Sequence, residues 1–194
     1  MSSIDKWKVL RSRYVLDNPW CRIRQDEVKL PNGHVIPDFF VRVKPDIALA
    51  IPVTDAGDVV FVRQYRHGVG KILLELPAGR FHGEQESPQK AAQRELQEET
   101  GYVAPQWEQL AVLHDNPVND TNSIYVFLAR GAYLGSDRAL DSTEDIEIVT
   151  VPTSQVRDRV LAGEIDVAGS VAALYLASCA GVFPLYGDRS QTAP

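Results

Sequence analysis

The chain has 194 residues, of which 44% are hydrophobic and 24% are charged, and its formal net charge at pH 7 is −6. This composition is ordinary for a globular protein, and the length suits one domain, or one domain with a small appendage. The acidic balance argues against a general nucleic-acid-binding protein, which would show a basic surface stripe.

The cysteine count and the hydropathy pattern exclude further classes. Cys21 and Cys179 are too few to indicate a disulfide framework or a zinc site, and we expect both to be buried free thiols. The N-terminal residues contain no apolar signal core, and no apolar run approaches 18 residues. We therefore expect no membrane segment and a cytoplasmic location.

The first part of the chain is rich in predicted strands. The turn Pro31-Asn32-Gly33 joins two of them as a hairpin, and residues 54–58 form a second turn. Residues 73–79 are typical of a short apolar strand that breaks into a glycine-containing loop. The other strands of this part are predicted over residues 7–15, 21–30, 34–43, 47–53 and 59–65.

A helix follows, with clear signals at both ends. Ser87 is a suitable N-cap, Pro88 fits the first helical position, and residues 89–100 contain good helix formers. Gly101 suits the left-handed position after a helix end. Beyond it, strands are predicted over residues 108–114, 123–129 and 146–151, and helices over residues 155–161 and 167–177. Strands with helices on their faces indicate an α/β sandwich.

Three carboxylates stand at positions i, i+3 and i+4 of the predicted helix 88–100. This spacing places Glu95, Glu98 and Glu99 on one helix face. At about 5–6 Å each pair repels by roughly 3 kcal/mol at an effective dielectric near 20. A hard divalent cation such as Mg²⁺ takes oxygen ligands of this type and would offset the repulsion. The alternative is a solvated acidic face without a ligand.

The segment from Gly79 to Tyr102 resembles the signature of the Nudix hydrolases, which cleave nucleoside diphosphates linked to another moiety. That signature runs Gly, five residues, Glu, seven residues, then Arg-Glu-apolar-any-Glu-Glu-any-Gly-apolar. Here Glu86, seven residues and the run Arg94-Glu95-Leu96-Gln97-Glu98-Glu99-Thr100-Gly101-Tyr102 match in register. Six residues, rather than five, separate Gly79 from Glu86. The longer loop makes Glu84 an alternative to Glu86, and the intact spacing to the helix favours Glu86.

The resemblance implies an α/β/α sandwich with a central mixed sheet, over about residues 45–180. We accordingly expect a Nudix hydrolase domain at residues 45–194. Residues 1–44 would form a small N-terminal antiparallel β-sheet extension that serves dimerisation and the substrate pocket.

Two further features resemble the nucleoside diphosphate sugar branch of this family. The first is Arg63-Gln64-Tyr65-Arg66, followed shortly by Leu74-Glu75-Leu76-Pro77-Ala78-Gly79. The second is Pro117, 16 residues after Gly101, an offset that marks ADP-ribose pyrophosphatases. The alternative for Pro117 is a plain loop proline in the turn sequence Asp115-Asn116-Pro117. Members of this branch are commonly homodimers, so the resemblance implies a homodimer here.

The resemblance also implies roles for individual residues. Mg²⁺, with Mn²⁺ as a possible substitute, would bind Glu95, Glu98, Glu99 and the backbone carbonyl of Ala78. Arg94 and Glu98 would belong to the catalytic set. Within it Arg94 would be structural, reaching Glu98 at i+4 and Glu86 across the loop and so holding the carboxylates in place. Arg66 can bind phosphate oxygens by a bidentate contact, and its alternative is an ordinary surface arginine.

The catalytic base of related ADP-ribose hydrolases comes from a later mobile loop. Here that loop is Ser142-Thr143-Glu144-Asp145-Ile146-Glu147, in which Glu144 matches best and Asp145 and Glu147 compete. The alternative is a solvated acidic turn.

An aromatic residue of the N-terminal extension would stack on the nucleobase. Trp20 is the first candidate, with Phe39 and Phe40 as alternative platforms, and the competing hypothesis places Trp20 in a core. An indole face offers stacking that tolerates different bases.

Together these features predict a Mg²⁺-dependent enzyme that hydrolyses the pyrophosphate bond of nucleoside diphosphate sugars to a nucleoside monophosphate and a sugar phosphate. ADP-ribose is the first expected substrate, followed by other ADP-sugars or GDP-mannose. Two alternatives are a Nudix-fold sensor of nucleotide sugars without catalysis, and a hydrolase of nucleoside triphosphates or dinucleotide polyphosphates. We expect neither a nucleic-acid nor a membrane partner.

Overall fold

The structure is a computed structural model that describes residues 4–184, and the chain packs into two compact units. Unit 1 contains the described residues up to Pro45 together with His114–Ser123. Unit 2 contains Asp46–Leu113 and the described residues from Ile124 onward.

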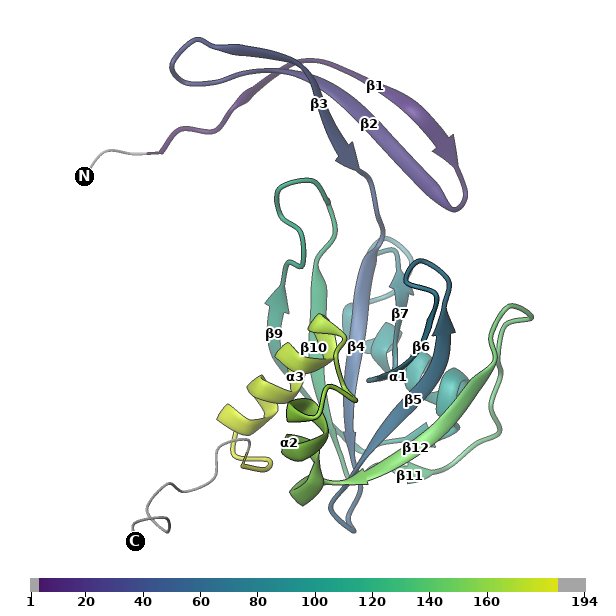
Figure 1. Ribbon diagram of the computed structural model, residues 1–194. Helices are drawn as coiled ribbons and strands as arrows, with labels where there is room; N and C mark the ends of the chain where they lie inside the picture. The colour runs from purple at the N-terminus through teal and green to yellow at the C-terminus, as the bar shows by residue number, and fades with distance from the viewer. Residues whose placement is uncertain (1–3, 185–194) are drawn as a thin grey trace, which may run out of the picture. The chain divides into compact units, whose positions relative to one another are not determined.

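Unit 1 is built on a three-stranded antiparallel sheet in the order β1-β2-β3, as predicted (Figure 1). Its strands are β1 (Lys8–Asn18), β2 (Cys21–Lys29) and β3 (Val35–Arg42). The turn between β1 and β2 is held by Asn18, whose side-chain oxygen accepts hydrogen bonds from the N–H groups of Trp20 and Cys21. All eleven residues of β1 are exposed, although the sheet carries many large apolar side chains.

Unit 2 is a seven-stranded mixed sheet. The path is β12-β5-β4-β10-β9, with β6 paired to β5 and β7 paired to β4, and only β4 and β10 run parallel. The strands are β4 (Asp46–Val53), β5 (Asp58–Arg66), β6 (Lys71–Glu75), β7 (Ala78–Phe81), β9 (Gln106–Leu113), β10 (Ile124–Arg130) and β12 (Ile146–Pro152). A separate pair joins β8 (Tyr102–Val103) to β11 (Tyr133–Leu134).

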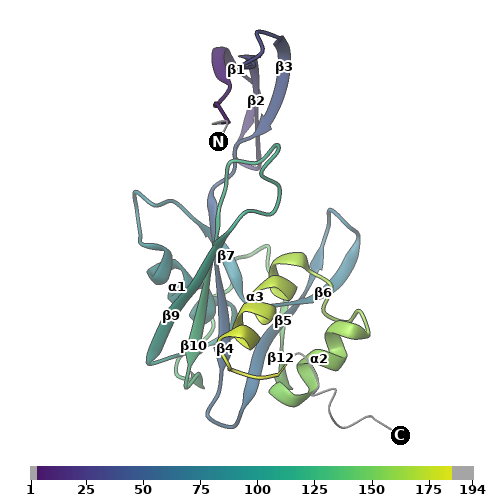
Figure 2. The ribbon, with the colours of Figure 1, turned by 90° about the vertical axis from the view of Figure 1, so that its left-hand side faces the viewer.

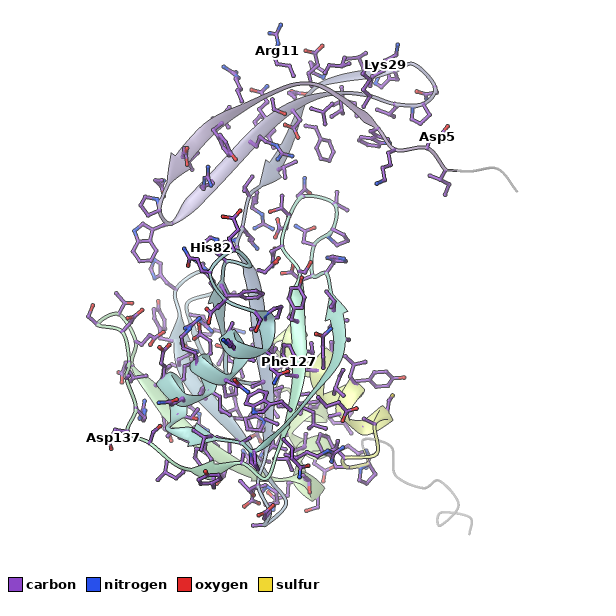
Figure 3. All side chains as sticks on the ribbon, turned by 180° about the vertical axis from the view of Figure 1, so that it is seen from behind. Asp5, Arg11, Lys29, His82, Phe127 and Asp137 are labelled. Atoms are coloured by element: carbon purple, nitrogen blue, oxygen red, sulfur yellow. The ribbon has the colours of Figure 1, made fainter. Side chains whose placement is uncertain are left out.

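Helices cover both faces of this sheet. Figure 2 shows α1 (Pro88–Thr100) on one face and α2 (Thr153–Leu161) with α3 (Ala168–Cys179) on the other. Strand β4 reads as continuous apolar sequence because both of its faces are covered, and residues 48–52 are buried. Phe127, labelled in Figure 3, packs with Ala48, Ala91 and Ala92 on the α1 side. The predicted α/β/α sandwich is confirmed.

Two sequence-based expectations differ from the structure. Ala78 and Gly79 were expected in a loop but belong to strand β7, because β4 offers its edge and pairs Gly79 with Ala48. Both cysteines are exposed rather than buried. Cys21 opens β2 beside a hairpin turn, and Cys179 is the last residue of α3, so neither reaches a core. Among the described residues, no helix is long and apolar enough to cross a membrane.

Asp120 has a buried carboxylate in unit 1. Its side chain is 1% exposed and contacts Arg42 Nε and Lys44 Nζ, each at 2.6 Å. Burial alone would raise the pKa of Asp120, but hydrogen bonds from Lys44 and Arg42 outweigh it and hold the pKa below its ordinary value. The folded state thus favours the ionised carboxylate, which links the loop His114–Ser123 to the end of β3.

The substitution Asp120→Asn should destabilise the protein at pH 7 by roughly 1.5–3 kcal/mol, the range for hydrogen bonds to charged groups. Because the folded-state pKa is lowered, the contribution is present above the unfolded-state pKa and is lost as pH falls through the folded-state value. Denaturant unfolding of both proteins between pH 7 and pH 2 measures the difference between their free energies of unfolding. Asp38→Asn, an exposed acid on β3, is the control and should change little. If the difference in free energy of unfolding stays constant down to pH 2, the pKa of Asp120 is not lowered in the folded state.

Candidate active site

Helix α1 is positioned by small side chains on the face that meets the sheet. Ala91, Ala92 and Leu96 are fully buried, and the helix packs on β4, β7 and β10. The predicted caps are confirmed, since the Ser87 side chain accepts from the N–H of Lys90 and Gly101 adopts a φ of 73°. The close approach that the alanines permit brings the last two turns of α1 against β7.

Gly79 is where the helix and β7 come closest. A Cβ placed on Gly79 would overlap the carboxyl group of Glu95, so only glycine leaves room for that carboxylate. The Glu95 side chain is 12% exposed and therefore lies between the helix and the strand, not in solvent. The glycine of the signature thus serves as a cradle for the first carboxylate.

Arg94 holds three carboxylates at once. Its Nη1 donates to Glu95 Oε1 at 2.7 Å and to Glu98 Oε2 at 2.9 Å, and its Nη2 donates to Glu86 Oε1 at 2.7 Å. The contacts with Glu98 and Glu86 are those expected from sequence, and Glu86 rather than Glu84 makes the contact across the loop. Hydrogen bonds from Arg94 to Glu86 raise the pKa of the guanidinium, with the charge of Glu95 and bonds to Glu98 adding to the effect against the cost of burial. Arg94 is therefore a permanent cation among acids.

Glu99 is the most deeply buried of the helix carboxylates. It is 4% exposed, and its Oε2 accepts a hydrogen bond from the backbone N–H of Ala78 at 3.2 Å. Burial raises the pKa of Glu99 to about 8, and repulsion from Glu95 and Glu144 adds to the effect, against the Ala78 bond and the charge of Arg66. Burial likewise raises the pKa of Glu95, although Arg94 opposes the shift. The site carries more negative charge than its own cations offset.

Glu144 is distant from α1 in the sequence, but its charge affects the carboxylates of that helix. Its charge adds to the raised pKa values of both Glu95 and Glu99, so Glu144 lies within electrostatic range of the two helix carboxylates. Within residues 4–184, no three His, Cys, Asp or Glu side chains are close enough to hold a metal ion as they stand. The oxygen donors and the glycine cradle fit a hard divalent cation, which would relieve the repulsion and draw the carboxylates together.

The acidic competitors of Glu144 lie differently. Asp145 is exposed, and Glu147 on β12 is 62% exposed and pairs with Arg63 Nη1 at 2.9 Å. No electrostatic influence of either acid on Glu95 or Glu99 ranks among the leading causes of their shifts. Of the three acids, Glu144 is the one whose charge contributes to the raised pKa values of Glu95 and Glu99.

Arg66 approaches the site from β5. Its Nε donates to Glu75 Oε1 at 2.6 Å, and its side chain is 45% exposed. Glu75 is a buried acid that sequence reasoning did not single out. The available signal was a lone carboxylate within the apolar run Leu73-Leu74-Glu75-Leu76.

The residues expected to bind the base lie in unit 1. Trp20 is 79% exposed, which rules out the hypothesis that it is a core tryptophan. Phe39 packs edge-on against Trp7, with ring centroids 5.7 Å apart, and Phe40 is half exposed. Pro117 lies in the loop of unit 1, between β9 and β10.

Comparison with known proteins shows which families the two parts of the chain match. The NUDIX domain matches residues 44–168, and the nucleoside diphosphate sugar hydrolase N-terminal domain matches residues 7–41. The ADP-ribose pyrophosphatase of Mycobacterium tuberculosis is 35% identical over 144 residues, covering 74% of this chain and 69% of the relative. The ADP-ribose pyrophosphatase of Bacillus subtilis is 29% identical, covering 91% and 95%.

A solved structure supports the fold independently. The crystal structure of an ADP compounds hydrolase superposes with a TM-score of 0.80 at 22% identity, covering 92% of this chain and 95% of that one. Together with the signature helix, its glycine cradle and the match over residues 44–168, these similarities show that the chain belongs to the Nudix hydrolase family, enzymes that act on pyrophosphate bonds.

Proposed function

We propose that this protein hydrolyses the pyrophosphate bond of nucleoside diphosphate sugars in the presence of Mg²⁺, with Mn²⁺ as a possible substitute. ADP-ribose is the first proposed substrate, and other ADP-sugars or GDP-mannose follow. The observation that carries the proposal is the burial of two helix carboxylates, Glu95 against Gly79 and Glu99 against the N–H of Ala78, with the charge of Glu144 in range of both. Two of the relatives described above are named for ADP-ribose hydrolysis, which supports the substrate class.

The metal would be held by Glu95, Glu98 and Glu99, with the backbone carbonyl of Ala78 beside them. When bound, Mg²⁺ supplies neutralisation of the pyrophosphate charge and polarisation of its phosphoryl oxygens. Arg94 orients the carboxylates through its contacts with Glu86, Glu95 and Glu98.

Glu144 is the proposed general base. It would take a proton from the attacking water as the water oxygen bonds to one phosphorus and the bridging P–O bond breaks. The products are a nucleoside monophosphate and a sugar phosphate. Arg66, oriented by Glu75, would bind phosphate oxygens that gain charge during this step.

Trp20 is the proposed platform for the nucleobase, in a pocket completed by a second copy of the chain. Its 79% exposure leaves the indole face available for stacking. Unit 1 also exposes an unusual set of large apolar side chains, which supports a homodimer formed through this sheet. They are Trp7, Val9, Leu10, Tyr14, Val15, Leu16, Val35 and Phe40.

Incubation with a panel of nucleotide sugars and Mg²⁺, followed by chromatography of the products, tests the function. The wild type should convert ADP-ribose to AMP and ribose phosphate. Glu99→Gln should lower kcat by at least about 100-fold, because it removes one electrostatic stabiliser while keeping the side-chain shape. Glu108→Gln is the matched control, an exposed acid on β9, and should keep full activity. Full activity of Glu99→Gln at saturating Mg²⁺ would exclude this helix as the metal site.

The substitution Gly79→Ala tests the cradle. The obstructing atoms are the end of the Glu95 side chain, so the backbone can keep its course while the carboxylate is displaced. We expect a folded protein whose kcat falls by roughly 100-fold, as for a misplaced catalytic group, and whose thermal stabilisation by Mg²⁺ is lost.

Gly83→Ala is the control for Gly79→Ala. Gly83 lies in the loop that follows β7 and has open space where a Cβ would be added. Its activity and Mg²⁺ response should match those of the wild type. Equal behaviour of the two alanine variants would show that Glu95 does not depend on Gly79.

The substitution Trp20→Ala should raise KM for ADP-ribose by roughly 5–100-fold, the equivalent of ~1–3 kcal/mol of stacking, with a smaller change in kcat. Because Trp20 is exposed, thermal stability should be nearly unchanged. Sedimentation of the full chain should show a dimer. A monomer with wild-type activity, or an unchanged KM in the variant, would refute the shared pocket. An effect in Phe40→Ala alone would move the platform to Phe40.

A further inference from the structure

The C-terminal end of α1 is covered by a segment that leads directly to Glu144. We call residues 135–139 the docking segment and residues 140–145 the Glu144 loop. Asp137, labelled in Figure 3, marks the docking segment within unit 2. The last carbonyls of a helix have no partner within the helix and must find one elsewhere.

The docking segment provides those partners. The Gly101 carbonyl accepts from the N–H groups of Gly135 and Ser136, at 3.1 and 3.2 Å, and the Glu98 carbonyl accepts from the N–H of Ala139 at 3.0 Å. The backbone of a proposed metal-binding residue, Glu98, is thereby joined to the residue that precedes the Glu144 loop.

Gly101 allows this contact to be close. A Cβ on Gly101 would stand 2.6 Å from the carbonyl oxygen of Ser136 and 3.5 Å from Cγ of Arg138. The left-handed φ of 73° separately favours glycine here. The signature glycine therefore ends the helix and also admits the docking segment, together with the aliphatic stem of Arg138.

Arg138 then closes the loop that carries Glu144. Its Nη2 donates to the backbone carbonyl of Ile146, the first residue of β12, at 2.6 Å. The two ends of the Glu144 loop are thus tied together by one side chain. Ile146 is buried in the sheet, where it pairs with Gln64 of β5, so Arg138 fastens the loop to a fixed point.

Within the loop, two hydrogen bonds with Asp141 form a turn that fixes the backbone and side chain of Glu144. Its N–H donates to the Asp141 carbonyl at 2.9 Å, and its Oε2 accepts from the Asp141 N–H at 3.0 Å. These bonds fix Glu144 relative to the loop but not to α1. The position of Glu144 relative to Glu95 and Glu99 depends on how the loop ends are held.

We propose that Arg138 is a positioning residue that fixes Glu144 with respect to the carboxylates of α1, by joining the docking segment to the start of β12. The hydrogen bond that Arg138 donates goes to the Ile146 carbonyl and not to a proposed metal or substrate group, so Arg138 would act through the loop. The inference rests on the proposed role of Glu144 as general base, and it adds a residue outside the family signature to the catalytic arrangement.

A double-mutant cycle tests this role in the full-length protein. Arg138→Met keeps the aliphatic stem beside Gly101 but removes the donor to Ile146. We expect kcat for ADP-ribose to fall by roughly 10–100-fold, as for a misplaced catalytic group. KM should change by less than about threefold, because no substrate contact is lost. In the Glu144→Gln background the same change should have no further effect, since the two residues act as one unit.

Conservative and control variants sharpen the cycle. Arg138→Lys retains a donor and should recover part of the loss. Arg130→Met removes an arginine of β10 that lies 4.0 Å from Glu108, and it should leave kcat unchanged. An equal loss from Arg138→Met in both backgrounds would overturn the proposal, and so would a fully active Glu144→Gln.

Amide hydrogen exchange gives a readout that does not depend on the substrate. Exchange over residues 139–145 should be faster in Arg138→Met than in the wild type, because the loop ends are released. Unchanged exchange there would refute the positioning role even if activity falls. If the wild type hydrolyses no nucleotide sugar, the proposed function fails, and the exchange result still decides whether Arg138 holds the loop.

Discussion

The arrangement of unit 2 depends on one constraint: Glu95 and Glu99, two like charges, are buried beside Gly79. Glu95 and Glu99 are nearly enclosed between α1 and β7, and Glu144 adds a third negative charge to the same field. Desolvation and mutual repulsion both oppose ionisation of such a cluster. A folded protein tolerates it only where hydrogen bonds, a fixed cation or a bound cation offset the cost. The cluster therefore lowers the stability of the fold, which accords with the proposed metal-binding role.

Arg94 is the part of that compensation which the chain supplies itself. One guanidinium contacts Glu86, Glu95 and Glu98, so the loop before α1 and the helix face are held in one arrangement. Its fork of donors suits several carboxylates better than a lysine ammonium would. Glu99 lies outside the reach of these contacts and bonds to the Ala78 N–H instead. The least compensated carboxylate is thus the one that lies deepest.

The sheet provides the precision that this cluster requires. Pairing of β7 with β4 sets the depth of Gly79, and the alanines of α1 allow the helix to approach it. The other face of the sheet packs on α2 and α3 through a larger apolar core. Rigid elements thus position the α1 carboxylates, whereas Glu144 comes from a loop whose ends are tied to α1 and β12. This arrangement suits the proposed roles, in which the α1 carboxylates bind the metal ion and Glu144 acts as the base from a loop.

Sequence alone determined the longer elements and their order, because hydrophobic periodicity and capping signals are local, but it missed the short strands β7, β8 and β11. Ser87, Pro88 and Gly101 bound the helix where expected, and the spacing of Glu95, Glu98 and Glu99 on one face is a property of helix geometry. The contact of Arg94 with Glu98 could be foreseen for the same reason, whereas its contact with Glu86 across the loop was implied by the resemblance to the Nudix signature.

Tertiary structure alone decided the contacts between segments far apart in the chain. Sequence could not show that Gly79 lies in a strand, that Trp20 is exposed, or that Arg138 ties the Glu144 loop to Ile146. Each depends on pairing or burial by residues distant in sequence, which local patterns do not encode. The electrostatic effect of Glu144 on Glu95 and Glu99 is of the same kind, since the loop and α1 come within range of each other only in the folded chain.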